Sequence, residues 1–167
     1  LFKRKLFEGI EFPYGKFSED LFTIYKTILK SRSITYIGFD GYFYYYRDEG
    51  SIVVSGYKKK HLEALDAVDD IEESVKGKGR FDNALSTQYI NVIYDIAARN
   101  PLLSEFRNKR IQNNLKAHRM SVLKDSNAPK RLRGFAAISL LGNRIVLKVV
   151  VARNRRWKVQ RRETKKR

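Results

Sequence analysis

The stretch GIEFPYGKFSEDLFTIYKTILK, residues 9–30, decides how the first part of the chain folds. Its Pro-Tyr-Gly-Lys segment predicts a turn, because proline and glycine so close together favour one, and Ser18 after it is a favourable helix N-cap. Apolar residues then recur at three- and four-residue steps, which predicts a helix that opens on Glu19 and Asp20. The apolar side expected to face a core consists of Leu21, Ile24 and Ile28, with Phe22, Tyr25 and Leu29 beside them.

The acidic pair Glu19-Asp20 has two interpretations. Acidic residues are favoured in the first turn of a helix because they complement its dipole and its unpaired N–H groups. The turn before the pair can also leave both carboxylates facing a cleft. Position in the helix alone leaves both interpretations open.

The whole string closely resembles a segment of the family 2 glycosyltransferases, which have the GT-A fold. The matching residues are LFKR (1–4), EGI (8–10), FP (12–13), GK (15–16), EDLFT (19–23) and YK (25–26). A second block, YYYR (44–47) followed by GSI (50–52), resembles a block that follows in the same enzymes. The resemblance implies an α/β fold: the C-terminal part of a GT-A mixed sheet, with two or three short strands, followed by a helix-rich extension. The nucleotide-binding N-terminal half of such an enzyme would be missing.

The resemblance also implies site residues. Asp20 matches the family's catalytic base, and Glu19 is the neighbour that would help to position the acceptor or the backbone. Arg47 stands where relatives place a cation near the donor diphosphate, and Ser51 and Tyr46 would line the same donor and acceptor site. An alternative for Arg47 is a surface ion pair with one of the acidic residues that follow it, which would contribute little to stability.

Family 2 enzymes commonly hold a divalent cation, Mg²⁺ or Mn²⁺, through an Asp-x-Asp motif. No Asp-x-Asp occurs in the 167 residues, so the ligands would lie mostly outside this chain, and the fragment alone is expected to be inactive. No metal ligand is assigned within it. The expected activity is transfer of a sugar from a nucleotide-sugar donor to a saccharide or lipid-linked acceptor, with inversion. The expected role is surface polysaccharide or glycoconjugate synthesis.

Three regions are predicted from the pattern along the chain. Residues 1–56 form the acceptor-side part, with strands at 33–38 and 41–47 where β-branched and aromatic residues gather. Residues 57–124 form a helical extension, with helices over 61–75, from 81 to about 100 and from 102 to 122. Acidic residues on the first of these predict a solvated face rather than a metal site. A plausible hinge at 125–129 precedes a basic amphipathic segment, 125–167.

The net charge of +17 is concentrated at the C-terminal end. From Lys130 to Arg167 there are 14 Lys and Arg against one Glu, so this segment holds +13 of the total. Its longest uncharged run is ten residues, about half of what a membrane-spanning helix needs. Wound as one helix, it has an apolar side that suits an interfacial helix on an anionic membrane. That side consists of Phe135, Ile138, Ile145, Val146 and Val149.

Other interpretations of the basic segment remain open. It can be an ordinary helix docked on the rest of the protein, followed by a disordered basic end. The high charge also admits a basic nucleic-acid-binding protein. The aromatics cluster near residues 39–46, however, far from the charge, so we expect no nucleic acid. A non-catalytic membrane-docking module is the remaining alternative. The absence of cysteine excludes disulfides and thiolate chemistry within the chain and fits a cytoplasmic protein. The basic segment would place it at the inner face of the cell membrane.

Overall fold

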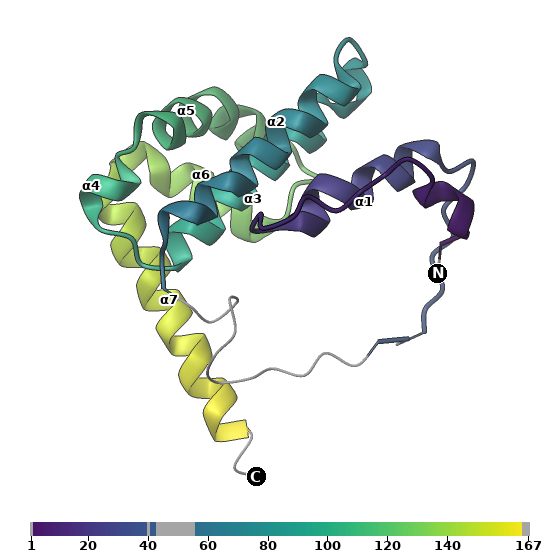
Figure 1. Ribbon diagram of the computed structural model, residues 1–167. Coiled ribbons are helices and arrows are strands. Elements are labelled where there is room, and N and C mark those ends of the chain that lie inside the picture. The colour runs from purple at the N-terminus through teal and green to yellow at the C-terminus, as the bar shows by residue number, and fades with distance from the viewer. Residues whose placement is uncertain (1, 40, 43–55, 165–167) are drawn as a thin grey trace.

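The computed structural model describes residues 2–39, 41–42 and 56–164, with side chains up to Asn154. Seven α-helices lie in this part of the chain (Figure 1): α1 (Glu19–Lys30), α2 (Glu63–Val75), α3 (Asp82–Ala98), α4 (Leu103–Phe106), α5 (Lys109–Lys124), α6 (Lys130–Ile138) and α7 (Asn143–Thr164). Short 3-10 turns accompany them: η1 (Arg4–Phe7), η3 (Lys59–Leu62), η4 (Gly79–Phe81) and η5 (Ser139–Leu141).

The predicted α/β fold with a mixed sheet is wrong. Residues 2–39, 41–42 and 56–164 contain no β-strand, and the architecture is a bundle of helices. The segment predicted as a strand at 33–38 is an exposed, irregular stretch in which Ile34 is 74% and Tyr36 92% exposed. β-branched and aromatic residues give a segment the propensity for a strand, but a strand also needs a neighbour to pair with, and this one has none among the described residues. The strand predicted at 41–47 falls largely outside them.

The predicted helices agree with the structure more closely than the predicted strands do. Helices α1, α2 and α3 occupy the segments that the apolar periodicity indicated, and Gly77, at a φ of +75°, follows the end of α2 as expected of a glycine there. The helix predicted over 102–122 is divided into α4 and α5. Asn108 makes the division, because its side chain accepts a hydrogen bond from the Arg110 backbone N–H at 2.9 Å and so caps α5.

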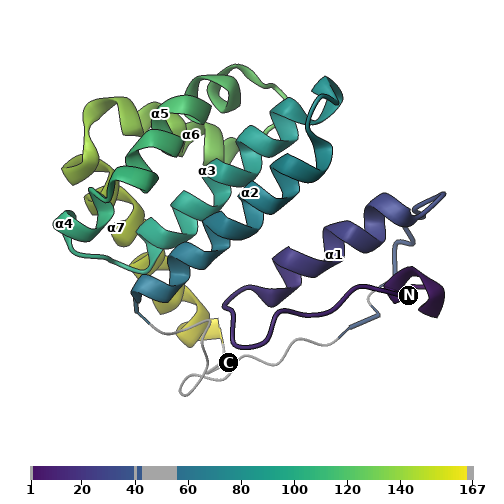
Figure 2. The ribbon, with the colours of Figure 1, turned by 45° about the horizontal axis from the view of Figure 1, so that its top comes forward.

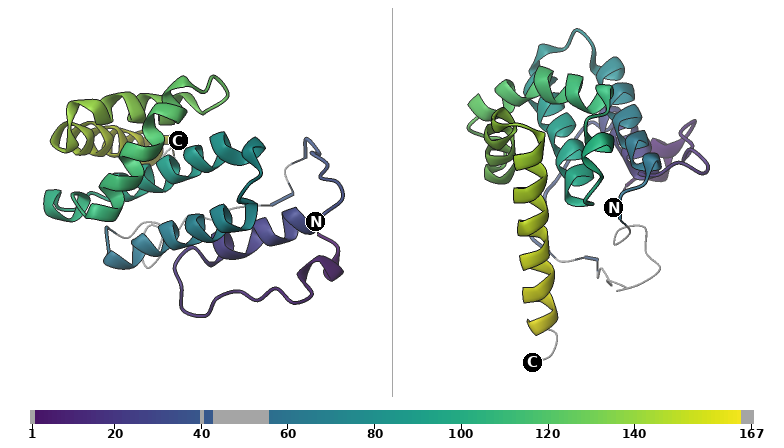
Figure 3. Two further views of the ribbon diagram at one scale, coloured as in Figure 1. Left: turned by 90° about the horizontal axis from the view of Figure 1, so that it is seen from above. Right: turned by 90° about the vertical axis from the view of Figure 1, so that its left-hand side faces the viewer.

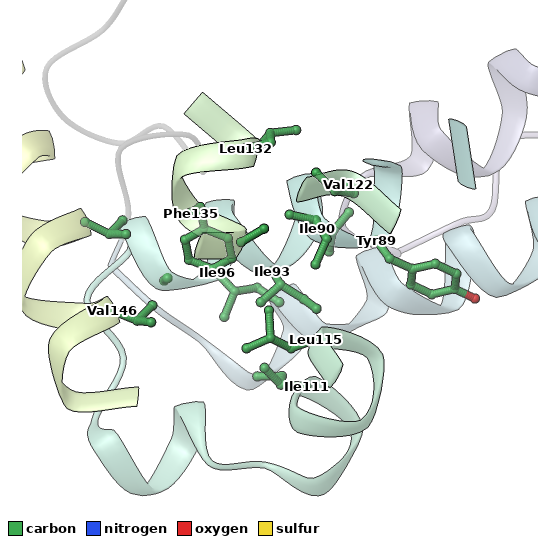
Figure 4. Close-up of a cluster of buried hydrophobic side chains, with 14 of the residues drawn as sticks. Tyr89, Ile90, Ile93, Ile96, Ile111, Leu115, Val122, Leu132, Phe135 and Val146 are labelled. Atoms are coloured by element: carbon green, nitrogen blue, oxygen red, sulfur yellow. The ribbon is translucent and has the colours of Figure 1, made fainter. Parts of the chain in front are cut away.

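The core is built around α3, which packs against α2, α5, α6 and α7. Its buried side chains meet those of the surrounding helices (Figure 4). The largest fully buried ones are Tyr89, Phe106, Leu65, Ile90, Ile93, Ile96, Ile111, Leu115, Leu132, Val68, Val122 and Val146. Ala128, Phe135 and Val150 belong to the same cluster, so the core draws on residues from both sides of the predicted hinge at 125–129.

Two residues of the predicted membrane-facing side are therefore buried inside the protein. Phe135 on α6 and Val146 on α7 are buried in the core, with 2% and 0% of their surfaces exposed. The single continuous helix assumed for this segment is also interrupted, because η5 and Gly142, at a φ of +106°, turn the chain between α6 and α7. An α-helix cannot continue through such a conformation.

Helix α1 lies outside this core and packs along α2 (Figure 2). The residues that it buries completely are Thr23 and Thr27, whose hydroxyls donate to backbone carbonyls within the helix. Leu21 reaches the edge of the core, whereas Ile28 and Leu29 are exposed. The expectation that the apolar side of this helix faces the core is thus wrong for Ile28, because α2 covers the threonine side instead.

Candidate functional site

The start of α1 is set by two residues with left-handed backbone conformations. Gly15 has a φ of +72°, which a glycine adopts without a steric penalty, and Ser18 has a φ of +60°. A serine in this region is uncommon and costs about 1 kcal/mol, which contacts of the surrounding structure must offset. Ser18 precedes the helix as predicted, but its side chain makes no capping hydrogen bond. Its carbonyl accepts from the Leu21 N–H at 2.9 Å instead.

Contacts from α2 hold the turn before Ser18. The backbone N–H of Phe17 donates to Glu63 Oε2 at 2.8 Å, and Lys16 Nζ lies 3.8 Å from Asp66 Oδ2. The Phe17 ring meets the ring of His61 edge to face, with 5.3 Å between the centroids. The turn is therefore attached to α2 at more than one point, which fixes the direction in which α1 begins.

A second set of contacts holds α1 further along. Tyr25 donates its hydroxyl hydrogen to Asp70 Oδ2 at 2.8 Å and lies 3.1 Å from the hydroxyl of Ser74. Lys26 forms an ion pair with the same Asp70 carboxylate at 3.1 Å. Burial raises the pKa of Tyr25 and Asp70 adds to the rise, while Ser74 opposes it. The phenol therefore stays protonated and serves as a donor.

The carboxylates of Glu19 and Asp20 have few partners within the described part of the chain. Both side chains are exposed, and neither forms an ion pair with any residue that the structure describes. Asp20 Oδ1 accepts a hydrogen bond from the adjacent Leu21 N–H at 2.8 Å. The pair thus stands at the N-terminal end of a helix whose position is fixed by other residues, and a second oxygen of Asp20 remains available to an outside donor.

The other predicted site residues are not placed. Arg47, Ser51 and Tyr46 fall within 43–55, outside the described residues. The donor and acceptor site predicted from them stays a prediction.

Sequence reasoning missed the anchoring residues. Lys16, Phe17 and Tyr25 belong to the matched string or lie beside it, yet their partners on α2 follow more than forty residues later. No local spacing connects such distant positions. The acidic residues of α2 were the available signal, and they were interpreted as a solvated face. Glu63, Asp66 and Asp70 are in fact half-buried and bind the first part of the chain.

The same helix uses its carboxylates on a second side. Arg110 on α5 binds Asp66 and Asp69, and the Tyr89 hydroxyl lies 2.7 Å from carboxylate oxygens of both Asp69 and Glu72. Burial, together with these two acceptors, raises the pKa of Tyr89 well above its usual range. An open depression of about 600 Å³ lies here. Four of the residues that line it, Asp69, Glu72, Tyr89 and Arg110, already bind one another, which makes this cluster a structural link between α2, α3 and α5.

The two histidines have structural environments. His61 Nδ1 lies 2.9 Å from the Lys58 backbone N–H, and burial lowers the pKa of its imidazole, with the nearby Arg99 adding to the effect. The ring of His118 stacks on Tyr89 with 4.2 Å between centroids and lies 3.1 Å from the Ser86 hydroxyl. Burial lowers the pKa of His118 too, against the opposing effect of Glu72. Both are therefore held in the neutral form near pH 7.

Within the described part of the chain, no three His, Cys, Asp or Glu side chains are arranged to hold a metal ion. Among the described helices, none combines the length and the hydropathy needed to cross a bilayer. Comparison with protein-family models, curated proteins and solved structures finds no match.

Proposed function

We propose that this chain is the C-terminal, acceptor-side part of a glycosyltransferase resembling family 2. The enzyme would transfer a sugar from a nucleotide-sugar donor to a saccharide or lipid-linked acceptor, inverting the anomeric configuration, in the synthesis of surface polysaccharide or glycoconjugates. Asp20 would accept the proton of the acceptor hydroxyl as its oxygen attacks the anomeric carbon, and Glu19 would help to position the acceptor. Arg47 would stabilise the charge that develops on the leaving diphosphate.

The observation that carries the proposal is an exposed carboxylate pair, without an ion pair among the described residues, on an anchored helix. A general base must lie within hydrogen-bond reach of the proton that it removes, so its position must be fixed while its oxygen stays free. The contacts of Lys16, Phe17 and Tyr25 with α2 meet the first condition. The exposure of Asp20 and its lack of a partner cation among the described residues meet the second.

The apolar surface around α1 supports the proposal as well. Several large apolar side chains of residues 2–39 are exposed: Phe2, Phe12, Tyr14, Ile28, Leu29, Ile34, Tyr36, Ile37 and Phe39. Large apolar side chains that are exposed in this number would be buried if another folded unit covered them. A donor-binding half, which would also supply the ligands for Mg²⁺ or Mn²⁺, fits this requirement. The enzyme would act in the cytoplasm, at the inner face of the cell membrane.

The test is sugar transfer by the longer enzyme that carries this chain, with Asp20→Asn compared against wild type over a panel of nucleotide sugars with Mg²⁺ or Mn²⁺. Loss of a general base costs about a hundredfold or more in kcat, while donor binding is retained. Asp82→Asn is the matched control, because Asp82 is also an exposed carboxylate in the first turn of a helix. Near-normal transfer by Asp20→Asn, or an equal loss in Asp82→Asn, would return Glu19 and Asp20 to a helix-capping role.

A further inference from the structure

One side of α7 is fixed to the helical bundle. Val146 and Val150 are buried in the core, Asn143 Nδ2 donates to Gln112 Oε1 at 3.0 Å, and Asn154 Nδ2 donates to the Ala98 carbonyl at 2.8 Å. These contacts occupy both ends and the middle of the segment from 143 to 154. The rotation of α7 about its own axis is therefore set, and the opposite side of this segment faces outward.

That outward side has an apolar centre. At about 100° per residue, Ile145, Val149 and Ala152 fall within an arc of about 60°. Ile145 is 42% and Val149 41% exposed, and Ala152 is exposed as well. Just before the helix, Leu140 and Leu141 of η5 are exposed at 50% and 66%. The other side of α7 is already packed against the bundle. These exposed apolar side chains are therefore available to contact another apolar surface or medium.

Cations border the apolar centre. On the same helical wheel, Arg144 and Lys148 lie on one side of the arc and Arg153 on the other, all three exposed. No acidic residue occurs from 126 to 162, while that stretch carries eleven Lys and Arg. Beyond Asn154 the helix continues to Thr164, and Figure 3 (right) shows it reaching away from the other helices. This part adds positive charge without any carboxylate before Glu163.

We propose that this surface, the α7 docking face (Ile145, Val149 and Ala152 bordered by Arg144, Lys148 and Arg153), binds an anionic lipid bilayer. Because the apolar strip has cations on both sides, the strip can enter the headgroup region while the cations meet lipid phosphates. A nucleic acid would pair with the cations but would leave the apolar strip in water. The bilayer satisfies both parts of the surface, and the exposed leucines of η5 lie beside it in the chain. The proposal does not depend on sugar transfer.

The α7 docking face differs from the membrane-facing side expected from the sequence. Phe135 and Val146 are excluded from it because they are buried in the core. Ile145 and Val149 remain, and they are joined by Ala152 and by the three bordering cations. The contact is therefore an outer face of a folded bundle rather than a free amphipathic segment, so we expect binding without a large change in helix content.

The experiment is co-sedimentation of the whole chain with phosphatidylcholine vesicles, with and without about one third phosphatidylserine. Binding is expected only with the anionic lipid and is expected to weaken as salt rises from about 0.1 M to about 1 M. Ile145→Ser with Val149→Ser is expected to weaken it by about tenfold, because two half-exposed apolar side chains lose their contact with lipid. Arg144→Gln with Lys148→Gln is expected to weaken it by about fivefold for each charge removed.

Matched controls separate this surface from the rest of the chain. Ile34→Ser with Ile37→Ser removes two exposed apolar side chains elsewhere, and Lys116→Gln with Lys124→Gln removes two exposed cations from α5. Both control variants are expected to bind as wild type does. Equal binding to neutral and anionic vesicles would overturn the proposal, as would full binding by either α7 variant. A control variant that loses as much as its α7 counterpart, or tighter binding to a single-stranded oligonucleotide than to the vesicles, would do the same.

Discussion

Asp70 is the residue on which the attachment of α1 to α2 depends most. Its carboxylate accepts the Tyr25 hydrogen bond and pairs with Lys26, and Asp70→Ala removes both contacts. A hydrogen bond to a charged group contributes about 1.5–3 kcal/mol when it is buried. Because the Asp70 side chain is 43% exposed, we reduce this to about 1 kcal/mol, with less than about 0.5 kcal/mol for the ion pair. The expected total is about 1–1.5 kcal/mol, which is about a five- to twelvefold increase in the equilibrium constant for the opening of α1.

The assay is amide hydrogen exchange of α1 in a double-mutant cycle. Tyr25→Phe alone is expected to cost about 1 kcal/mol of opening free energy, and combining it with Asp70→Ala is expected to add little, because both changes remove the same bond. Glu73→Ala is the control. Its carboxylate pairs only with Lys76 among the described residues, and alanine raises the helix propensity there too, though less than at Asp70 because glutamate is a better helix former than aspartate. Effects of Asp70→Ala and Tyr25→Phe that add to within about 0.3 kcal/mol would refute the reasoning.

Two further predictions concern stability. Gly134→Ala is expected to raise the free energy of unfolding by about 0.5–1 kcal/mol, because this glycine lies inside α6 with open space for a Cβ. Gly142→Ala is expected to lower the free energy of unfolding, because Gly142 has a φ of +106°. Urea unfolding of both variants checks this, and a change of the same sign in both would contradict it. Burial depresses the pKa of His61 and His118 in the folded state. The stability that depends on their neutral form is therefore present above about pH 6.5 and is lost as pH falls through the lowered pKa values. The free energy of unfolding measured with urea is expected to be lower at pH 5.5 than at pH 7.5 by up to about 1 kcal/mol per histidine. His118→Gln is expected to reduce this pH dependence, and an unchanged dependence in that variant would count against it.

Local pattern was sufficient for the helices and for little else. The apolar periodicity of residues 19–30, 61–75 and 81–98 places three helices correctly, because a helix is held by hydrogen bonds between residues four apart and its apolar side repeats at the same spacing. The apolar periodicity did not predict the division between α4 and α5. It depends on one side chain, Asn108, taking the place of a helical hydrogen bond.

The sequence by itself determined the distribution of charge, the existence of most helices and the position of Glu19 and Asp20 at the start of one of them. Only the tertiary structure decided which sides of these helices are covered. Helix α1 buries Thr23 and not Ile28, and α7 buries Val146 and leaves Ile145 exposed. A periodic sequence shows that a helix has an apolar side, but the neighbour that covers it lies far along the chain. The segment at 33–38 follows the same rule, since a strand forms only where a partner supplies its hydrogen bonds.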